Sequence, residues 1–200
     1  MEIVELRIAA QNGDLARLHA ALAEGVDVDF RDADGETALH CAAYFGHTAC
    51  LKALLAAGAS VDHVESEGGI PLHCASYAGC AACVRILIAA GSDVHREDQC
   101  GWTPFSWCFS CALYDGHCRV LKILLRAGAD VRTETVPRFD HNTSAWALVD
   151  AIRAAGGWPQ YVTLNPPTTF ASVVNKAIHG ALPEPLPLEI AAFLVPAGGF

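Results

Sequence analysis

Apolar residues recur along the chain at the three- and four-residue spacing of amphipathic helices. Leu51, Leu54 and Leu55 fall on one helical face. The preceding pair Ala42–Ala43 is small, so two helices can approach each other closely there. Gly58 follows the leucines at the position where a left-handed residue ends a helix. This pattern predicts a pair of packed helices.

The same pattern returns every 33 residues. Gly35, Gly68 and Gly101 share this spacing, and so do Gly58 and Gly91. The aligned copies are Asp32–Val64, Glu65–Glu97 and Asp98–Thr133, with an earlier partial copy at Leu6–Arg31. Each copy predicts a turn, a helix, a second turn and a second helix. One such unit cannot bury its apolar face alone, so the copies are expected to stack.

The recurring L-H-x-A and L-L-x-x-G segments, in phase with the turn glycine, resemble the ankyrin repeat. The resemblance covers roughly residues 4–132. It implies an all-α fold, an α-solenoid with short β-turn fingers and a helical C-terminal cap. It also implies a non-enzymatic protein–protein interaction scaffold or adaptor that needs no cofactor.

Three segments are predicted along the chain. Residues 1–132 form about four repeats, and the first is a degenerate N-terminal cap in which Arg17 stands where later copies have Cys50 and Cys83. Residues 133–158 carry the apolar stripe of a degenerate fifth repeat or C-terminal cap helix. Residues 159–200 form an uncharged, proline-containing connection and a C-terminal helical tail.

Composition and charge narrow the function. The hydrophobic content of 52% and charged content of 18% exclude a disordered chain. No apolar run has the length of a membrane span. The net charge of −9 argues against binding to nucleic acid or to an anionic membrane. We expect a monomer that binds a protein partner with a basic segment.

The cysteines indicate a reducing compartment. Their number, nine, is odd, and the first residues lack the layout of a secretory signal. Reduced thiols in the cytoplasm, or the nucleus, are therefore expected. Cys80, Cys83, Cys108 and Cys111 form two C-x-x-C pairs, and a structural zinc site is one alternative. The pairs are separated by more than the usual zinc-ligand spacing, and Cys83 and Cys108 occupy core positions of the repeat, which favours packing.

The histidines of L-H-x-A are not expected to be catalytic. His40 and His73 are followed by Cys41 and Cys74, but adjacent residues on a helix point about 100° apart and cannot form a dyad. The resemblance implies that each histidine ties the backbone to a turn instead.

The candidate partner-binding residues lie at turn tips and before the internal glycine of each repeat, which the resemblance places on the concave groove. They are Asp34, Glu36, Tyr44, Phe45, Glu67, Tyr77, Gln99, Trp102, Tyr114 and Asp115. Exposed aromatic residues are typical of binding surfaces. A four-residue insertion near 109–114 enlarges the fourth repeat.

Acidic residues concentrate in the turns. Eleven of the 22 fall in residues 27–36, 62–67 and 93–98. Asp32 and Asp98 precede turns and are expected to fix them. Asp34, Glu36, Glu65 and Glu67 have no predicted structural role, so we expect them to attract a basic partner.

The segment Leu182–Leu194 has a faint resemblance to the ends of SOCS boxes and F-boxes. It implies an alternative function, recruitment of groove-bound clients to a ubiquitin ligase. The competing prediction is a helix packed on the repeats.

Overall fold

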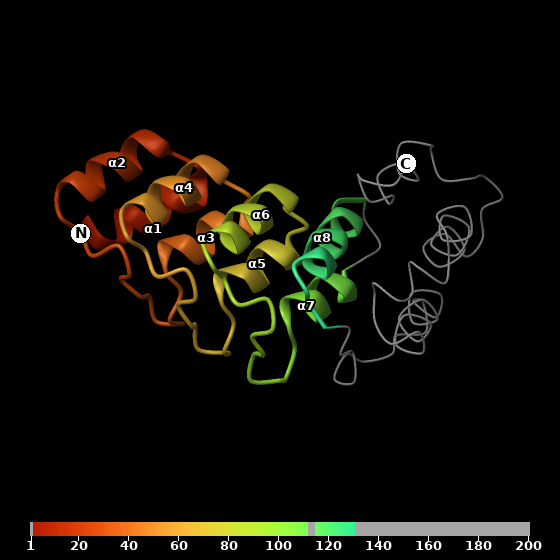
Figure 1. Ribbon diagram of the computed structural model, residues 1–200. Coiled ribbons are helices and arrows are strands. Elements are labelled where there is room, and N and C mark those ends of the chain that lie inside the picture. The colour runs from red at the N-terminus through yellow and green to blue at the C-terminus, as the bar shows by residue number, and fades with distance from the viewer. Residues whose placement is uncertain (1, 112–114, 131–200) are drawn as a thin grey trace, which may run out of the picture. The chain divides into compact units, whose positions relative to one another are not determined.

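The computed structural model describes residues 2–111 and 115–130 (Figure 1). The chain divides into two units, Met1–Ala129 and Asp130–Phe200, and the description below concerns the first. The helices of the described residues are α1 (Glu2–Asn12), α2 (Leu15–Ala23), α3 (Ala38–Tyr44), α4 (Thr48–Ala56), α5 (Pro71–Tyr77), α6 (Ala81–Ala89), α7 (Pro104–Ser110) and α8 (Asp115–Arg126). No strand occurs among these residues, and none of their helices is long and apolar enough to cross a membrane.

The helices form two layers. In the first layer α1, α3, α5 and α7 pack in series, and in the second layer α2, α4, α6 and α8 do the same (Figure 1). The loops before α3, α5 and α7 extend from the first layer as three fingers, residues 27–36, 60–69 and 93–102. Gly35, with φ of +78°, donates its N–H to the Asp32 carbonyl and closes a tight turn. The predicted all-α solenoid with short turn fingers is confirmed.

The core follows the predicted repeat pattern. Ala42, Ala43, Ala75 and Ser76 are fully buried, as close approach between helices of the first layer requires. The largest fully buried side chains are mostly leucines from both layers: Leu18, Leu39, Leu51, Leu54, Leu72, Leu87 and Leu124. Arg17 is exposed, as expected for a capping repeat.

Histidines tie the first two fingers to the helices that follow them. Nδ1 of His40 accepts the Thr37 N–H at 3.2 Å, and Nδ1 of His73 accepts the Ile70 N–H in the same way. The proton of His73 is therefore on Nε2, which donates to the Trp102 carbonyl of the next finger at 3.0 Å. These bonds confirm the structural role predicted for both histidines.

The buried histidines are expected to make the fold sensitive to acid. Burial lowers the pKa of His40 to about 4. Protonation of Nδ1 would also break its hydrogen bond, because two N–H groups, those of Nδ1 and Thr37, would then face each other. An unfolded histidine titrates near pH 6.5, so the unfolded chain binds a proton that the folded chain rejects. The free energy of unfolding is therefore highest above pH ~6.5 and falls as the pH is lowered towards 4. His40 alone should account for a loss of roughly 3 kcal/mol.

Urea unfolding of the full chain between pH 7.5 and 4 measures this loss. His40→Gln should flatten the profile, whereas the exposed His95→Gln should leave it unchanged. A wild-type profile that does not fall between pH 6.5 and 4 contradicts the assignment.

Several predicted features lie outside the described residues. They are the cap helix predicted within 133–158, the connection and tail at 159–200 with its SOCS-box-like or F-box-like segment, and Tyr114. They stay predictions.

Candidate functional site

Four aromatic side chains form a row along the first layer, which we call the aromatic row: Phe45, Tyr44, Tyr77 and Trp107. The ring centroids of Tyr44 and Phe45 lie 5.1 Å apart, and Tyr44 stacks on Tyr77 at 5.9 Å. Tyr77 meets Trp107 edge to face at 5.8 Å. Tyr44, Phe45 and Tyr77 are 44%, 48% and 42% exposed. Three repeats thus contribute to one continuous, accessible apolar surface.

Trp107 is a member that the sequence analysis missed. It is one repeat after Cys74 and two after Cys41, in the position following the histidine of L-H-x-A. The 33-residue register was the signal that could have identified it. Its indole N–H donates to the Asp98 carboxylate at 2.8 Å. Trp107 therefore joins the aromatic row to the third finger, and both border the same face.

Trp102, the aromatic residue predicted for this face, lies at the base of the third finger. Its side chain is partly exposed, and its backbone groups form hydrogen bonds within the fold. Its N–H donates to the Asp98 carboxylate at 2.8 Å, and its carbonyl accepts from His73 and from the Asp98 N–H.

One carboxylate holds each finger in shape. Asp32 accepts the N–H groups of residues 34 and 36, and Asp98 accepts those of residues 100 and 102. Glu65 does the same for residues 67 and 69, at 2.7 and 2.6 Å. The prediction that Glu65 has no structural role is therefore wrong. Glu65 is in register with Asp32 and Asp98, and its longer side chain still reaches the same two donors.

The fingers are also bonded to one another. The Ser66 N–H donates to the Asp34 carbonyl at 2.9 Å, and the Gln99 N–H donates to the Glu67 carbonyl at the same distance. The Gln99 side chain adds a bond to the Ser66 carbonyl at 2.6 Å. Gln99, predicted as a binding residue, thus links two fingers. The side chains of Asp34 and Glu67 are exposed on this ladder.

The fingers concentrate the negative charge of the protein. They hold eleven acidic side chains and two arginines, a net charge of −9, which equals that of the whole chain. The rest of the sequence has as many basic as acidic side chains. The carboxylates that hold the fingers in shape are included in this charge and contribute to its electrostatic field.

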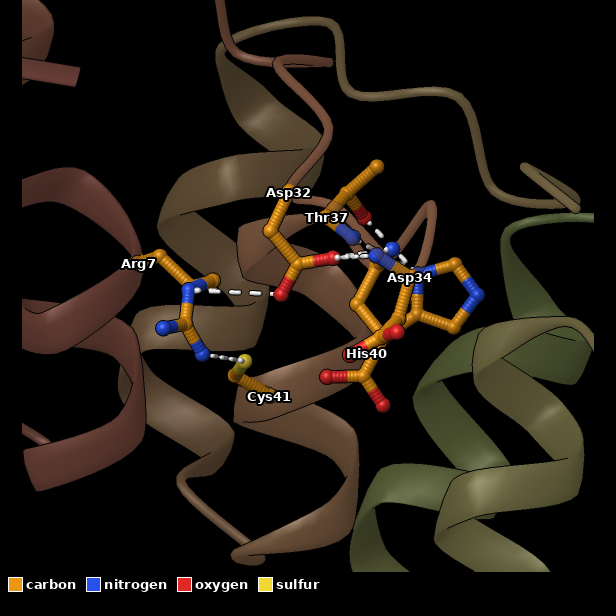
Figure 2. Close-up of polar contacts among 7 residues, drawn as sticks. Arg7, Asp32, Asp34, Thr37, His40 and Cys41 are labelled. Carbon is orange, nitrogen blue, oxygen red and sulfur yellow. Dashed lines mark hydrogen bonds and ion pairs between the residues drawn. The ribbon is translucent and has the colours of Figure 1, made fainter. Parts of the chain in front are cut away.

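The first finger has an additional anchor on α1. Figure 2 shows Arg7 between Asp32 and Cys41, with Nε 3.6 Å from the Asp32 carboxylate and Nη1 3.8 Å from the Cys41 sulfur. Arg7 is in register with His40 and His73, and its ion pair with Asp32 takes the place of the link that His73 makes to the next finger. Glu36 is partly buried nearby, and burial followed by the charge of Asp32 raises the pKa of its carboxyl group.

Comparison with family models agrees with this geometry. A model of ankyrin repeats in three copies matches residues 6–98, and a second ankyrin-repeat model matches residues 72–125. The chain belongs to the ankyrin-repeat family. No curated protein matches it in sequence. Ankyrin repeats are generally protein–protein interaction modules, and ankyrin-repeat proteins are typically non-enzymatic.

The four cysteines of the zinc hypothesis differ in their exposure. Cys83 and Cys108 are fully buried, and the Cys108 thiol donates to the His117 carbonyl at 3.3 Å. Cys80 and Cys111 are partly exposed. Among residues 2–111 and 115–130, no group of three or more His, Cys, Asp or Glu is arranged to hold a metal ion.

The last candidate residues are at the insertion in the fourth ankyrin repeat. Asp115 begins α8, although its side chain is not among those described. Tyr114 precedes it outside the described residues.

The capping role of Glu65 can be tested with its neighbour as a control. Glu65→Ala removes the acceptor for two backbone N–H groups of the second finger, and should lower the free energy of unfolding by about 1–2 kcal/mol. Glu67→Ala removes an exposed carboxylate and should change it by less than about 0.5 kcal/mol. Chemical denaturation of both variants measures the difference. Equal effects would contradict the assignment of Glu65.

Proposed function

We propose that this protein is a non-enzymatic scaffold or adaptor that binds a basic segment of a partner protein between its aromatic row and its acidic fingers. The observation that carries the proposal is the coincidence of the two features. The accessible aromatic surface borders the same face as the fingers that account for the whole net charge.

The aromatic row supplies the apolar anchor. Tyr and Trp are enriched among the residues that dominate binding energy, because they bury much area and lose little side-chain entropy. Three members of the row are more than two-fifths exposed although they are large and apolar. Exposed aromatic faces also attract the cationic groups of Lys and Arg.

The fingers supply long-range attraction and a fixed geometry. Charge of one sign raises the rate of encounter with a partner of opposite charge, and salt screens the effect. The backbone bonds from finger to finger hold these charges in place before binding, so little order has to be gained on association. A basic, extended segment therefore fits this edge.

Two further expectations accompany this function. The histidines of the first layer are occupied in structural bonds rather than poised for proton transfer, in keeping with a binding role. The eight cysteines whose side chains are described are free thiols, in keeping with action in the cytoplasm or nucleus. We also expect the protein to act as a monomer.

Selection from a library of displayed random peptides tests the proposal. Peptides enriched on the wild-type protein are expected to carry several Lys or Arg residues beside an apolar or aromatic residue. Two variants separate the two features. Tyr77→Ala shortens the aromatic row, and the joint reversal of the exposed Asp34, Glu67 and Glu97 to Lys removes no finger hydrogen bond.

Kinetics with one enriched peptide complete the test. Tyr77→Ala should mainly speed dissociation, weakening binding by roughly 30-fold, or about 2 kcal/mol. The triple reversal should slow association and flatten its dependence on salt. Both variants should retain the wild-type melting temperature within a few degrees. Enrichment of acidic or neutral peptides, or binding indifferent to both variants, would refute the proposed function.

A further inference from the structure

The turn between α5 and α6 carries two thiols that the proposed function does not use. Cys80 is the residue before α6, where it is partly exposed, and Cys83 is fully buried one turn into the helix. The two cysteines are three residues apart across the start of α6, a spacing that places neighbouring side chains on one face of a helix. A partly exposed thiol at the start of the helix thus neighbours a buried one.

Cys83 follows the repeat pattern, since Cys50 occupies the same site in the preceding repeat, but Cys80 departs from it. The residue in register with Cys80 is His47 in the preceding repeat, and His117 occupies the same site in the following one. His47 Nε2 contacts the Gln11 carbonyl at 3.0 Å, and His117 Nε2 contacts the Tyr77 carbonyl at 2.7 Å. Each histidine thereby ties its repeat to the one before.

The shorter Cys80 side chain fills the site less tightly than the histidines do. A Cβ placed on Gly13 would lie 2.6 Å from the His47 ring, but a Cβ placed on Gly46 would lie 3.5 Å from the Cys80 sulfur. The third repeat therefore has a thiol beside a second thiol where its neighbours have a histidine that bonds to the preceding repeat.

The surroundings divide the two thiols into different chemical roles. The neighbouring Cys83 thiol lowers the pKa of Cys80, with a smaller contribution from the backbone N–H groups of Cys83 and Ala82, although burial opposes this shift. The neighbouring Cys80 thiol and then burial raise the pKa of Cys83. Of the two thiols, Cys80 therefore loses its proton more readily, and the thiolate is the form that attacks a disulfide.

We propose that Cys80 and Cys83 form a redox-active dithiol, a site that small-molecule disulfides oxidise to an intramolecular disulfide. The Cys80 thiolate attacks one sulfur of the oxidant, which forms a mixed disulfide and expels the other sulfur as a thiolate. The Cys83 sulfur then attacks the Cys80 sulfur and expels the second thiolate. The proton of Cys83 passes to one leaving thiolate and a proton from water passes to the other, so one disulfide is reduced to two thiols as the protein dithiol is oxidised.

The exposure of each sulfur fits this sequence. The first step requires contact with a molecule from solution, and Cys80 is accessible. The second step is internal, so the complete burial of Cys83 does not hinder it. Residues that begin a helix and lie three apart fall within the separation that a disulfide spans. The proposal is independent of the binding function, because it involves neither the aromatic row nor the finger carboxylates.

Equilibration with glutathione tests the proposal. The full chain is incubated at neutral pH with oxidised and reduced glutathione in varied ratio, then quenched, alkylated and digested with trypsin. Cys74, Cys80 and Cys83 fall on one peptide, Ala53–Arg85. At oxidising ratios, the mass of this peptide should fall by two hydrogen atoms, and Cys80 and Cys83 should no longer be alkylated. At reducing ratios, the two hydrogen atoms and the alkylation of both cysteines should return.

Three variants assign the step. Cys83→Ser should trap glutathione on Cys80, because the resolving thiol is gone. Cys80→His, which restores the residue type of the neighbouring repeats and so should fold, should leave Cys83 unmodified. Cys74→Ser should close its disulfide as the wild type does. A lasting mixed disulfide on wild-type Cys80, a disulfide that includes Cys74, or no change in the peptide at any ratio would overturn the proposal.

Discussion

Replacing Leu87 by alanine is expected to lower the free energy of unfolding by about 2–5 kcal/mol. Leu87 is fully buried in α6, a helix that packs against α4 in the preceding repeat, α5 in its own repeat and α8 in the next. Truncation removes apolar area and leaves a cavity that rigid helices on three sides cannot fill. In a repeat array the loss extends to the interfaces with both neighbours, so cooperative unfolding is expected to weaken as well.

Leu55→Ala is the matched control. Leu55 also lies in the last turn of a second-layer helix, but it is partly exposed, so the same truncation should cost clearly less. Urea denaturation of the full chain, followed by circular dichroism, measures both values. If Leu87→Ala costs no more than Leu55→Ala, the helix packing described above is incorrect.

The fold could be predicted because it repeats. A 33-residue period places glycines, leucines and small residues at equivalent sites, and each copy confirms the assignment of the others. Gly58, Gly91 and Gly128 have φ values of +91°, +93° and +93°, as expected for residues that end helices. The predicted burial of Leu54 and of the small pairs followed from the same register.

The candidate site was harder to predict because residue type and register pointed in different directions. Trp102 attracted the prediction as an aromatic residue near a turn tip, but register places it at the finger base with Glu36 and Gly69. Trp107 is the tryptophan in contact with Tyr77. Glu65 was assigned to binding because Asp is the usual residue that fixes a turn. Only the finger geometry shows that a longer carboxylate bonds the same two donors.

Gly68→Ala is expected to destabilise the protein by roughly 2–4 kcal/mol, through two separate effects. Gly68 has φ of +90°, a conformation that costs a residue with a side chain about 1–2 kcal/mol. A Cβ there would also lie 2.7 Å from the Gln99 nitrogen and 3.1 Å from the backbone of Asp98. The second and third fingers would have to separate, which breaks the bond from the Gln99 N–H to the Glu67 carbonyl.

Gly91→Ala isolates the first effect. Gly91 has φ of +93°, but a Cβ placed on it meets no atom within 4 Å, so this variant should lose only the conformational part, about 1–2 kcal/mol. Denaturant unfolding of the two variants gives the difference, which is the contribution of finger contact. Gly68→Ala should also weaken the binding of a basic peptide that was selected on the wild-type protein. Because the substitution changes no charge, this loss would come from displacement of the finger carboxylates rather than from their removal. Equal stability losses in the two variants, with peptide affinity unchanged, would mean that the fingers do not act as one bonded edge.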